Sequence, residues 1–181
     1  IIIRLKYRID VSRVNENKIV VATNNKGKLK EIRKHFDPFN CRMISQKDLK
    51  IDSIPETGDS FKSNALQKAI HLASFTNYPI IADDSGLVVD ALNGEPGVYS
   101  ARYAGDESND DDNIDLLLHR MTQEKNRKAY FHCSLIYLDP NDTSNPVLIE
   151  TQWHGIICSE KSGDKGFGYD PIFFIPELDK T

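Results

Sequence analysis

Two adjacent acids follow an apolar run in the segment PIIADDSGLVVDAL, where Asp83 and Asp84 come directly after residues 79–82. Neighbouring carboxylates repel each other unless a cation or hydrogen-bond donors compensate their charge. Magnesium suits such a site, because one or two carboxylates together with substrate phosphates satisfy it. Successive strand residues point to opposite faces, so we expect only one of the two acids to meet the metal. The loop IPETGDSF adds a third acid, Glu56, and strengthens this interpretation over the alternative of a turn with one capping acid.

A second polar segment lies in IVVATNNKGKLKEI, where an apolar run leads into a turn and then into a helical pattern. The amides and dipole at the start of such a helix favour an anion, and the turn adds hydroxyl, amide and ammonium groups that bind phosphate. The GxxxxGK[ST] spacing of a Walker A loop is absent. The alternative is a capped turn with surface lysines, which local sequence alone favours.

The segment SGDKGFGYDPIFF combines three glycines with the flat side chains of Phe167 and Tyr169. An aromatic residue on a glycine-rich loop could stack on a nucleobase. The alternative is a hydrophobic plug that enters a final strand, and this is the better interpretation for Phe173 and Phe174.

The elements that must position these residues alternate between helix and strand. Apolar periodicity predicts strands at 18–23, 41–45, 79–83, 129–138 and 147–154, and helices at 27–36, 61–75 and 108–122. The strand at 79–83 should end in a Ser-Gly turn after the two acids, and the segment DPNDTSNP should connect the last two strands as a hairpin. Ser108 and Asn109 are candidate N-caps. For Asn64 and Lys68 the alternative is a solvated helix face, and for Lys68 taken alone it is the better interpretation. The order predicts a mixed α/β sheet and not a pure Rossmann arrangement.

The composition limits the classes of function. The chain has 181 residues and a formal net charge of -4, with 39% hydrophobic and 28% charged residues. A domain of this size buries a real core, and its acidity disfavours binding to a nucleic-acid polymer. Three distant cysteines argue against a disulfide framework or a zinc knuckle and fit a reducing cytosol. No apolar stretch reaches the length of a membrane span. The chain starts with Ile and stops at ELDKT, so we expect residues to be missing at one or both ends.

Five segments occur in an order that resembles one family. They are ATNNKGKLKEI, PETGDSFKSNALQKA, ADDSGLVVDALNGEPGVYSARYAG, FHCSLIYL and GFGYDPIFFIP, and together they look like the inosine triphosphate pyrophosphatases. The resemblance covers about residues 18 to 181 and leaves residues 1–17 unassigned. It implies one domain with an elongated mixed sheet, flanking helices and two lobes around a central cleft. It also implies a magnesium-dependent, cytoplasmic homodimer that cleaves inosine, xanthosine and deoxyinosine triphosphates to the monophosphate and pyrophosphate.

The resemblance also implies roles for individual residues. Asp84 would bind the metal and act as general base, supported by Asp83, and Glu56 would be a second metal ligand. Lys68 would reach the phosphates and Ser85 would touch the substrate. The triphosphate would be held by Thr23, Asn24, Asn25, Lys26, Gly27 and Lys28. The base and sugar would be held by Phe167, Gly168, Tyr169 and Asp170. Arg102 is a further site candidate without an assigned contact.

The sequence departs from the family pattern at its end. Family members continue to a lysine and a Ser-His-Arg motif that reads the 6-oxo group of the base, whereas this sequence stops at Thr181. Three other functions stay open. They are a pyrophosphatase for modified pyrimidine or bulky nucleotides, a nucleotide-binding module inactive without its tail, and a metal-dependent phosphomonoesterase that releases orthophosphate.

Overall fold

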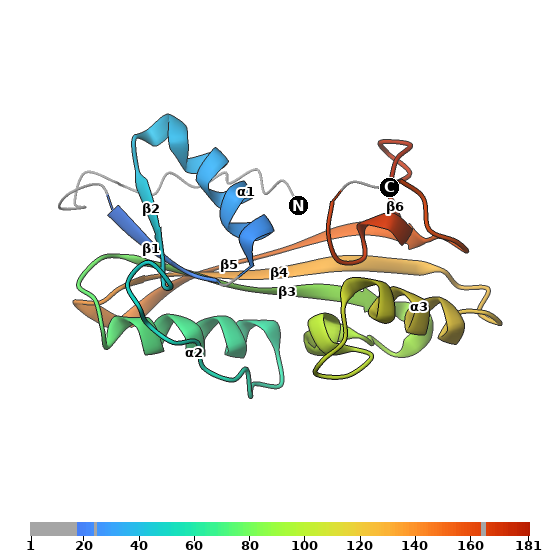
Figure 1. Cartoon of the computed structure of the whole chain (residues 1–181), viewed down its shortest axis with the longest axis horizontal. Helices are drawn as coiled ribbons and strands as arrows, with labels where there is room; N and C mark the ends of the chain where they lie inside the picture. Colours follow the sequence, from blue (N-terminus) through green and yellow to red (C-terminus); the bar gives the residue numbers. More distant parts are fainter. Residues whose placement is uncertain (1–17, 24, 164–165) are drawn as a thin grey trace. The chain divides into compact units, whose positions relative to one another are not determined.

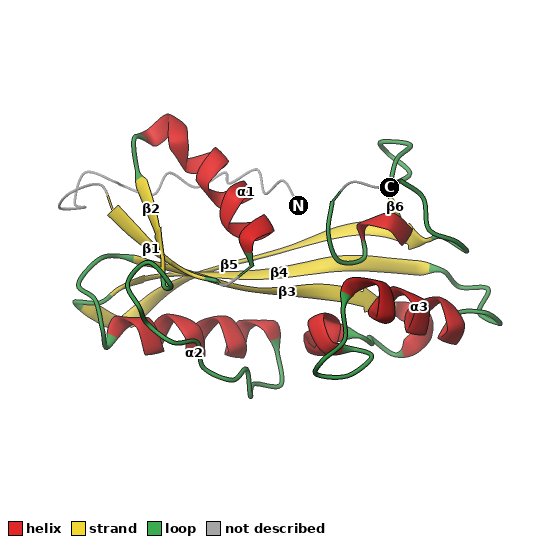
Figure 2. Cartoon of the chain, in the orientation of Figure 1, coloured by secondary structure: helices red, strands yellow, loops and turns green. Residues whose placement is uncertain are grey.

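The computed structural model describes residues 18–23, 25–163 and 166–181. Helices and strands alternate through the first half of the chain, and strands dominate the second (Figure 2). In chain order the elements are β1 Lys18–Ala22, α1 Lys26–Phe36, β2 Arg42–Ser45, α2 Phe61–Ala73, β3 Ile80–Val89, α3 Asp110–Arg120, β4 Lys128–Asp139, β5 Asp142–Ile157 and β6 Phe173–Phe174. All the predicted helices and strands are present, with shifted boundaries.

The strands form one six-stranded sheet in the order β2-β1-β3-β4-β5-β6. β1 pairs in parallel with β2 and with β3, whereas β5 and β6 are antiparallel. A two-residue turn joins the neighbouring strands β4 and β5, which makes them an antiparallel hairpin. The predicted mixed α/β sheet with flanking helices is therefore confirmed.

The chain divides into two compact units, and the division falls inside β3, β4 and β5. The first unit contains the described residues up to Asp84 and the segment Ser134–Glu150. The second contains Ser85–Cys133 and Thr151–Thr181. Each unit has hydrophobic clusters of its own.

In the first unit, α1 and α2 lie on opposite sides of the strands (Figure 1). The apolar residues of β3 alternate between these two sides. Ile80 and Ala82 belong to the cluster that contains the buried stripe of α2, and Ile81 belongs to the cluster packed against α1. The same alternation carries Asp83 toward α1 and Asp84 toward α2.

The predicted end of β3 was wrong. The strand does not stop at Asp83 and turn at Ser-Gly, but runs for ten residues from Ile80 to Val89. The apolar residues that follow the acids explain this, because Leu87 and Val89 are fully buried in the core of the second unit. The backbone N–H of Leu87 donates to Ser100 Oγ at 2.9 Å, so this part of the strand is also tied to a neighbouring 3₁₀ turn. The two acids therefore lie within a continuous strand.

The connection between the last two long strands is also shorter than predicted. β5 begins at Asp142 and not at Val147, so the turn consists of two residues instead of eight. Residues 142–145 are exposed and polar, and they therefore show no apolar alternation by which sequence could reveal a strand. The backbone N–H of Asn141 donates to Asp139 Oδ1 at 2.9 Å, which stabilises the tight turn.

In the second unit, α3 begins with a complete capping box. Asn109 Oδ1 accepts from the Asp112 N–H, and the Asp112 carboxylate accepts from the Asn109 N–H. Asn109, one of the two predicted candidates, is thus the N-cap. The helix buries Ile114 and Leu117 in a cluster that also contains Tyr169. The acidic start of α3 and the C-terminal loop therefore belong to one packed region.

Candidate active site

The turn between β1 and α1 is organised by its own side chains. Thr23 Oγ1 accepts from the Asn25 N–H at 3.1 Å, and Asn25 caps α1 by accepting from the Lys28 N–H at 3.1 Å. The predicted capped turn is thus present. Asn24 lies outside the described residues, as does the side chain of Lys26. Gly27 is part of the first turn of the helix.

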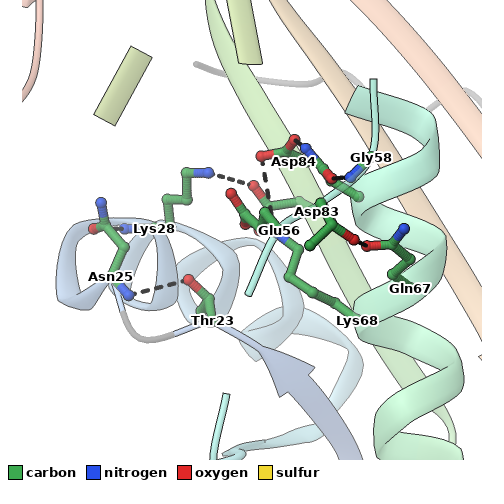
Figure 3. Close-up of polar contacts among 11 residues, drawn as sticks. Thr23, Asn25, Lys28, Glu56, Gly58, Gln67, Lys68, Asp83 and Asp84 are labelled. Atoms are coloured by element: carbon green, nitrogen blue, oxygen red, sulfur yellow. Dashed lines mark hydrogen bonds and ion pairs between the residues drawn. The ribbon is translucent and has the colours of Figure 1, made fainter. Parts of the chain in front are cut away.

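Lys28 points from α1 to the sheet, as Figure 3 shows, and its Nζ lies 2.7 Å from Asp83 Oδ2. The Asp83 side chain is only 8% exposed, so this ion pair is shielded from solvent on the carboxylate side. The pair joins the phosphate-binding turn predicted from sequence to the acidic doublet. The positive charge of Lys28 also compensates the negative charge of Asp83, one of the two adjacent buried acids.

Asp84 faces α2 and meets a different set of partners. Asn64 Nδ2 donates to Asp84 Oδ2 at 2.9 Å, and Lys68 Nζ lies 3.8 Å from Asp84 Oδ1. The same Lys68 ammonium donates to Glu56 Oε1 at 2.6 Å (Figure 3). Lys68 thus brings together the two carboxylates that sequence reasoning assigned to a metal site.

Asn64 and Lys68 do not lie on a solvated helix face, and this local interpretation was wrong for both. Asn64 is completely buried and the Lys68 side chain is 15% exposed. Asn64 Oδ1 accepts from the Gly58 N–H at 2.8 Å while its amide nitrogen donates to Asp84. The asparagine therefore connects the Glu56 loop to the acid on β3, a role that the sequence analysis missed.

The surroundings of Asp84 raise the pKa of its carboxyl group. Burial is the main cause, and the negative charge of Glu56 adds to it. The ammonium of Lys68, the amide of Asn64 and the charge of Lys28 act in the opposite direction without cancelling the effect. A carboxylate made more basic in this way is better suited to accept a proton from water.

The donor set fits a hard divalent cation that also binds substrate. Within residues 18–23, 25–163 and 166–181, no cluster of three or more His, Cys, Asp or Glu side chains could hold a metal alone. Glu56 and Asp84 nevertheless converge on a single positive group, which shows that both can face one cation. Two carboxylates without a complete protein cage are typical of magnesium sites that are completed by phosphate oxygens and water. Ser85 follows Asp84 in β3 and is partly exposed.

The predicted base-binding residues belong to the second unit, and most of their polar atoms hold the loop itself. Tyr169 is 4% exposed, and its hydroxyl donates to the Ser100 carbonyl at 2.9 Å. Burial raises the pKa of this phenol, so it stays neutral and keeps its donor proton. Asp170 Oδ2 accepts from the Phe167 N–H at 3.0 Å, and the Gly168 N–H donates to Asp110 Oδ2 at 2.7 Å. The Phe167 side chain is left as the exposed aromatic group of this segment.

Arg102 lies on the 3₁₀ turn Gly97–Arg102, where its guanidinium stands over the Tyr99 ring at 5.4 Å. Ser100, on the same turn, was not predicted as a site residue. Its hydroxyl accepts from the Leu87 N–H and donates to the Gly97 carbonyl, while its carbonyl holds Tyr169. No short motif signals such a role, because all of these contacts involve the main chain of Ser100 or of its partners.

Comparisons with known proteins identify the family of this chain. The model of the Ham1 family matches residues 19–181. A dITP/XTP pyrophosphatase of Pectobacterium atrosepticum is 48% identical over 166 residues, which cover 91% of this chain and 84% of that protein. A protein of the same name from Escherichia coli K12 is 46% identical over the same shares of the two chains.

Solved structures give the same assignment. A HAM1 protein from Coxiella burnetii superposes with a TM-score of 0.84 at 38% identity, and the Ham1 protein of Staphylococcus aureus with 0.79 at 41%. Each comparison covers 91% of this chain and 84% of the other. No helix among the described residues is long and apolar enough to cross a membrane. The family model covers residues 19–181, and the curated relatives and solved structures match most of the chain. The chain therefore belongs to the Ham1 family.

Proposed function

We propose that this protein is a nucleoside triphosphate pyrophosphatase that hydrolyses inosine, xanthosine and deoxyinosine triphosphates to the monophosphate and pyrophosphate. The observation that carries the proposal is the buried Asp84, whose pKa is raised and which shares Lys68 with Glu56. The names of the relatives from Pectobacterium atrosepticum and Escherichia coli support the choice of substrates. The reaction removes deaminated purine nucleotides from the nucleotide pool.

In this proposal Asp84 is the general base that accepts a proton from the attacking water. Asn64 holds one carboxylate oxygen at 2.9 Å and so keeps the other available. Lys68 and Lys28 supply positive charge to the phosphates, and each exchanges its present carboxylate partner for a phosphate oxygen. Phosphoryl transfer depends mainly on such positioning and charge compensation.

Glu56 and Asp84 would hold Mg²⁺, which supplies charge neutralisation on the phosphate oxygens and makes a bound water more acidic. The turn of Thr23, Asn24, Asn25, Lys26, Gly27 and Lys28 surrounds the triphosphate at the start of α1, where a helix N-terminus favours an anion. Ser85 contacts the substrate beside Asp84. All of these residues belong to the first unit except Ser85, which is the first residue of the second.

Base and sugar recognition falls to Phe167, Gly168, Tyr169 and Asp170. Phe167 offers its exposed ring for stacking, while Tyr169 and Asp170 keep the loop in shape. A pocket that hydrogen-bonds a 6-oxo acceptor rejects a 6-amino donor, which would separate inosine from adenosine. We further propose that residues 18–181 act as one catalytic domain in a cytoplasmic homodimer.

Incubation with inosine triphosphate and magnesium tests this function, with pyrophosphate and orthophosphate measured separately. Adenosine triphosphate is the comparison substrate, and Asp84→Asn is the variant that lacks the base. We expect pyrophosphate from inosine triphosphate, little from adenosine triphosphate, and a kcat lower by roughly 10²- to 10⁴-fold in Asp84→Asn, as for loss of a general base. Lys62→Met, on an exposed position of α2, is a control that should leave kcat unchanged.

Each alternative function has its own result in this assay. Release of orthophosphate in place of pyrophosphate would indicate a phosphomonoesterase. Faster turnover of a modified pyrimidine nucleotide would change the substrate class. Binding of inosine triphosphate without any product, in a chain that also carries the Ser-His-Arg tail, would contradict the enzymatic proposal altogether.

A further inference from the structure

The acidic run DESNDDDN (residues 106–113) has the composition of a solvated loop and a helix start, yet its carboxylates have separate partners. Asp112 completes the capping box of α3. Asp111 lies 2.7 Å from the Nζ of Lys161. Asp110 turns to the C-terminal loop, where its Oδ2 accepts from the Gly168 N–H at 2.7 Å. One acid in this run therefore contacts the backbone of the segment assigned to base recognition.

We propose that Asp110 is a positioning residue for the GFGYD segment (residues 166–170) and that it sets the placement of the Phe167 ring against a purine base. The inference rests on the proposed function, because it takes Phe167 as the surface on which the base stacks. Asp110 acts through the loop and does not touch the substrate in this assignment.

The backbone of the GFGYD segment needs external support. Gly166 and Gly168 have φ angles of +92° and +58°, in the region that residues with a side chain rarely adopt. Glycine enters this region at no steric cost but shows little preference for it, so the sequence alone does not hold the turn in one shape. Contacts from other elements must select the conformation.

Three side-chain hydrogen bonds help to select the conformation of the segment, besides a main-chain bond from the Asp170 N–H to the Phe167 carbonyl at 3.3 Å. Asp170 Oδ2 accepts from the Phe167 N–H within the segment. The hydroxyl of Tyr169 donates to the Ser100 carbonyl at 2.9 Å and anchors the segment to a 3₁₀ turn. Asp110 is the third contact and is charge-assisted, which makes it stronger than a neutral hydrogen bond.

The position of the Asp110 contact gives it a specific effect on Phe167. Gly168 lies between the exposed Phe167 and the buried Tyr169. The orientation of its peptide plane therefore determines the direction in which the backbone runs from the anchored Tyr169 to Phe167. Without Asp110, the Tyr169 anchor and the Asp170 contact remain and the core is intact, but the Gly168 peptide loses the contact that fixes its direction. We therefore expect weaker base recognition with an intact fold and an intact phosphate site.

Steady-state kinetics with Asp110→Ala and Asp110→Asn test the inference, with Asp111→Ala as the matched control. Asp111→Ala removes the same charge from the same helix turn but breaks a contact to Lys161 instead. We expect Asp110→Ala to raise KM for inosine triphosphate by roughly three- to tenfold, as for one exposed charge-assisted contact, with kcat little changed. Asp110→Asn keeps an acceptor oxygen and should recover most of the affinity.

Inorganic tripolyphosphate separates base recognition from phosphate binding, because it lacks a base. As a competitive inhibitor it should have the same inhibition constant for wild type and Asp110→Ala. An equal KM in Asp110→Ala and Asp111→Ala would overturn the inference. So would a loss of tripolyphosphate affinity that matches the loss for inosine triphosphate, since the change would then not be confined to the base.

The Gly168 amide proton gives a readout that does not depend on turnover. In the ¹⁵N-labelled protein, its resonance should shift upfield in Asp110→Ala, shift partway in Asp110→Asn and stay in place in Asp111→Ala. An unchanged resonance in Asp110→Ala would show that the contact is absent and would overturn the inference. A wild-type chain that fails to hydrolyse inosine triphosphate but shows the expected shift would overturn the proposed function and the base-recognition role, while the Asp110 contact itself would stand.

Discussion

The two polar regions of this molecule are built on opposite principles. In the first unit, charged side chains from α1, α2, β3 and the Glu56 loop pair with one another, with Lys28 on Asp83 and Lys68 between Glu56 and Asp84. In the second unit, the GFGYD segment is held mainly by hydrogen bonds that involve backbone groups. The first region is a cluster of ion pairs, and the second is a backbone conformation held by hydrogen bonds.

The difference matches the two parts of the proposed substrate. A triphosphate is strongly anionic, so its site must supply cations, and these cations need temporary partners when the substrate is absent. A purine base is flat and uncharged, so its site needs an accurately placed ring and few charges. Substitutions in the first unit should therefore act on the chemical step, and substitutions in the second unit on affinity.

Lys68→Met should reduce kcat/KM more than any other substitution proposed below. A small reduction would contradict the contrast drawn between the two units. The variant keeps much of the side-chain length but removes the positive charge shared by Glu56 and Asp84. We expect kcat/KM for inosine triphosphate to fall roughly 10²- to 10³-fold, as for loss of one preorganised group that stabilises charge in the transition state. Lys62→Met on the same helix is the control, and a similar loss in both variants would argue against a specific role.

Two glycine substitutions, one in each unit, test the contrast between the units and should change the kinetic constants by intermediate amounts. A Cβ at Gly58 would lie 2.6 Å from Ser63 Oγ and 2.7 Å from Asn64 Oδ1, so Gly58→Ala displaces the group that holds Asp84. We expect a lower kcat and a loss of about 1–3 kcal/mol in the free energy of unfolding, as for overpacking.

The partner substitution is Gly166→Ala, in which the new Cβ would clash with Asp170 Oδ2 at a φ of +92°. This variant should raise KM for inosine triphosphate with a smaller change in kcat. Kinetics and urea unfolding of the two variants provide the measurement. If both variants lowered kcat to the same extent, the separation between chemistry and affinity would fail.

The smallest expected effect is on stability and depends on pH. The pKa of Asp84 is raised above the ordinary value of 3.8, so the folded state binds the proton more tightly than the unfolded state does. At a pH between the Asp84 pKa of the unfolded state and that of the folded state, the folded state holds more protons than the unfolded state. The free energy of unfolding therefore falls as pH rises through this range. This loss is complete once the pH exceeds the folded-state pKa.

Asp84→Asn removes this titration and should be more stable than wild type at neutral pH in the absence of metal. The two proteins should converge as pH falls toward the ordinary aspartate range. Thermal unfolding across pH with a chelator present measures the difference. A neutral-pH midpoint for Asp84→Asn below that of wild type would show that the partners of Asp84 outweigh the cost of its burial.

The sequence predicted the regular elements of the first unit because they carry strong local signals. The run at residues 19–22 is buried along its whole length, and the helix around Ala65 and Leu72 shows its apolar stripe. The error at the end of β3 arose because Ser85 and Gly86 are typical turn residues. Their tendency was overridden by the burial of Leu87 and Val89, which only the tertiary structure reveals.

Residues that act through main-chain contacts could not be predicted in the same way. Asn64 on a helix and Asp110 in an acidic run both look like ordinary solvated side chains in the sequence. Their roles depend on the N–H groups of Gly58 and Gly168, which are distant in the chain or belong to another element. The roles proposed for the phosphate turn and for the base-binding residues stay predictions.

The continuous course of β3 has a consequence for how this protein tolerates insertions and deletions. The register Val21↔Ile81 and Ala22↔Ala82 fixes which acid faces which helix, and a change of one residue exchanges the two faces. A single insertion upstream of Ala82 would bring Asp83 into the place of Asp84 and would set Ala82 opposite Lys28, whereas a single deletion there would set Asp84 opposite Lys28 and Ser85 in the place of Asp84. After a shift of one residue in either direction the repeated aspartate thus keeps a carboxylate on one side of the strand only, and a shift of two residues removes it from both sides, so we expect every length change here to impair the site.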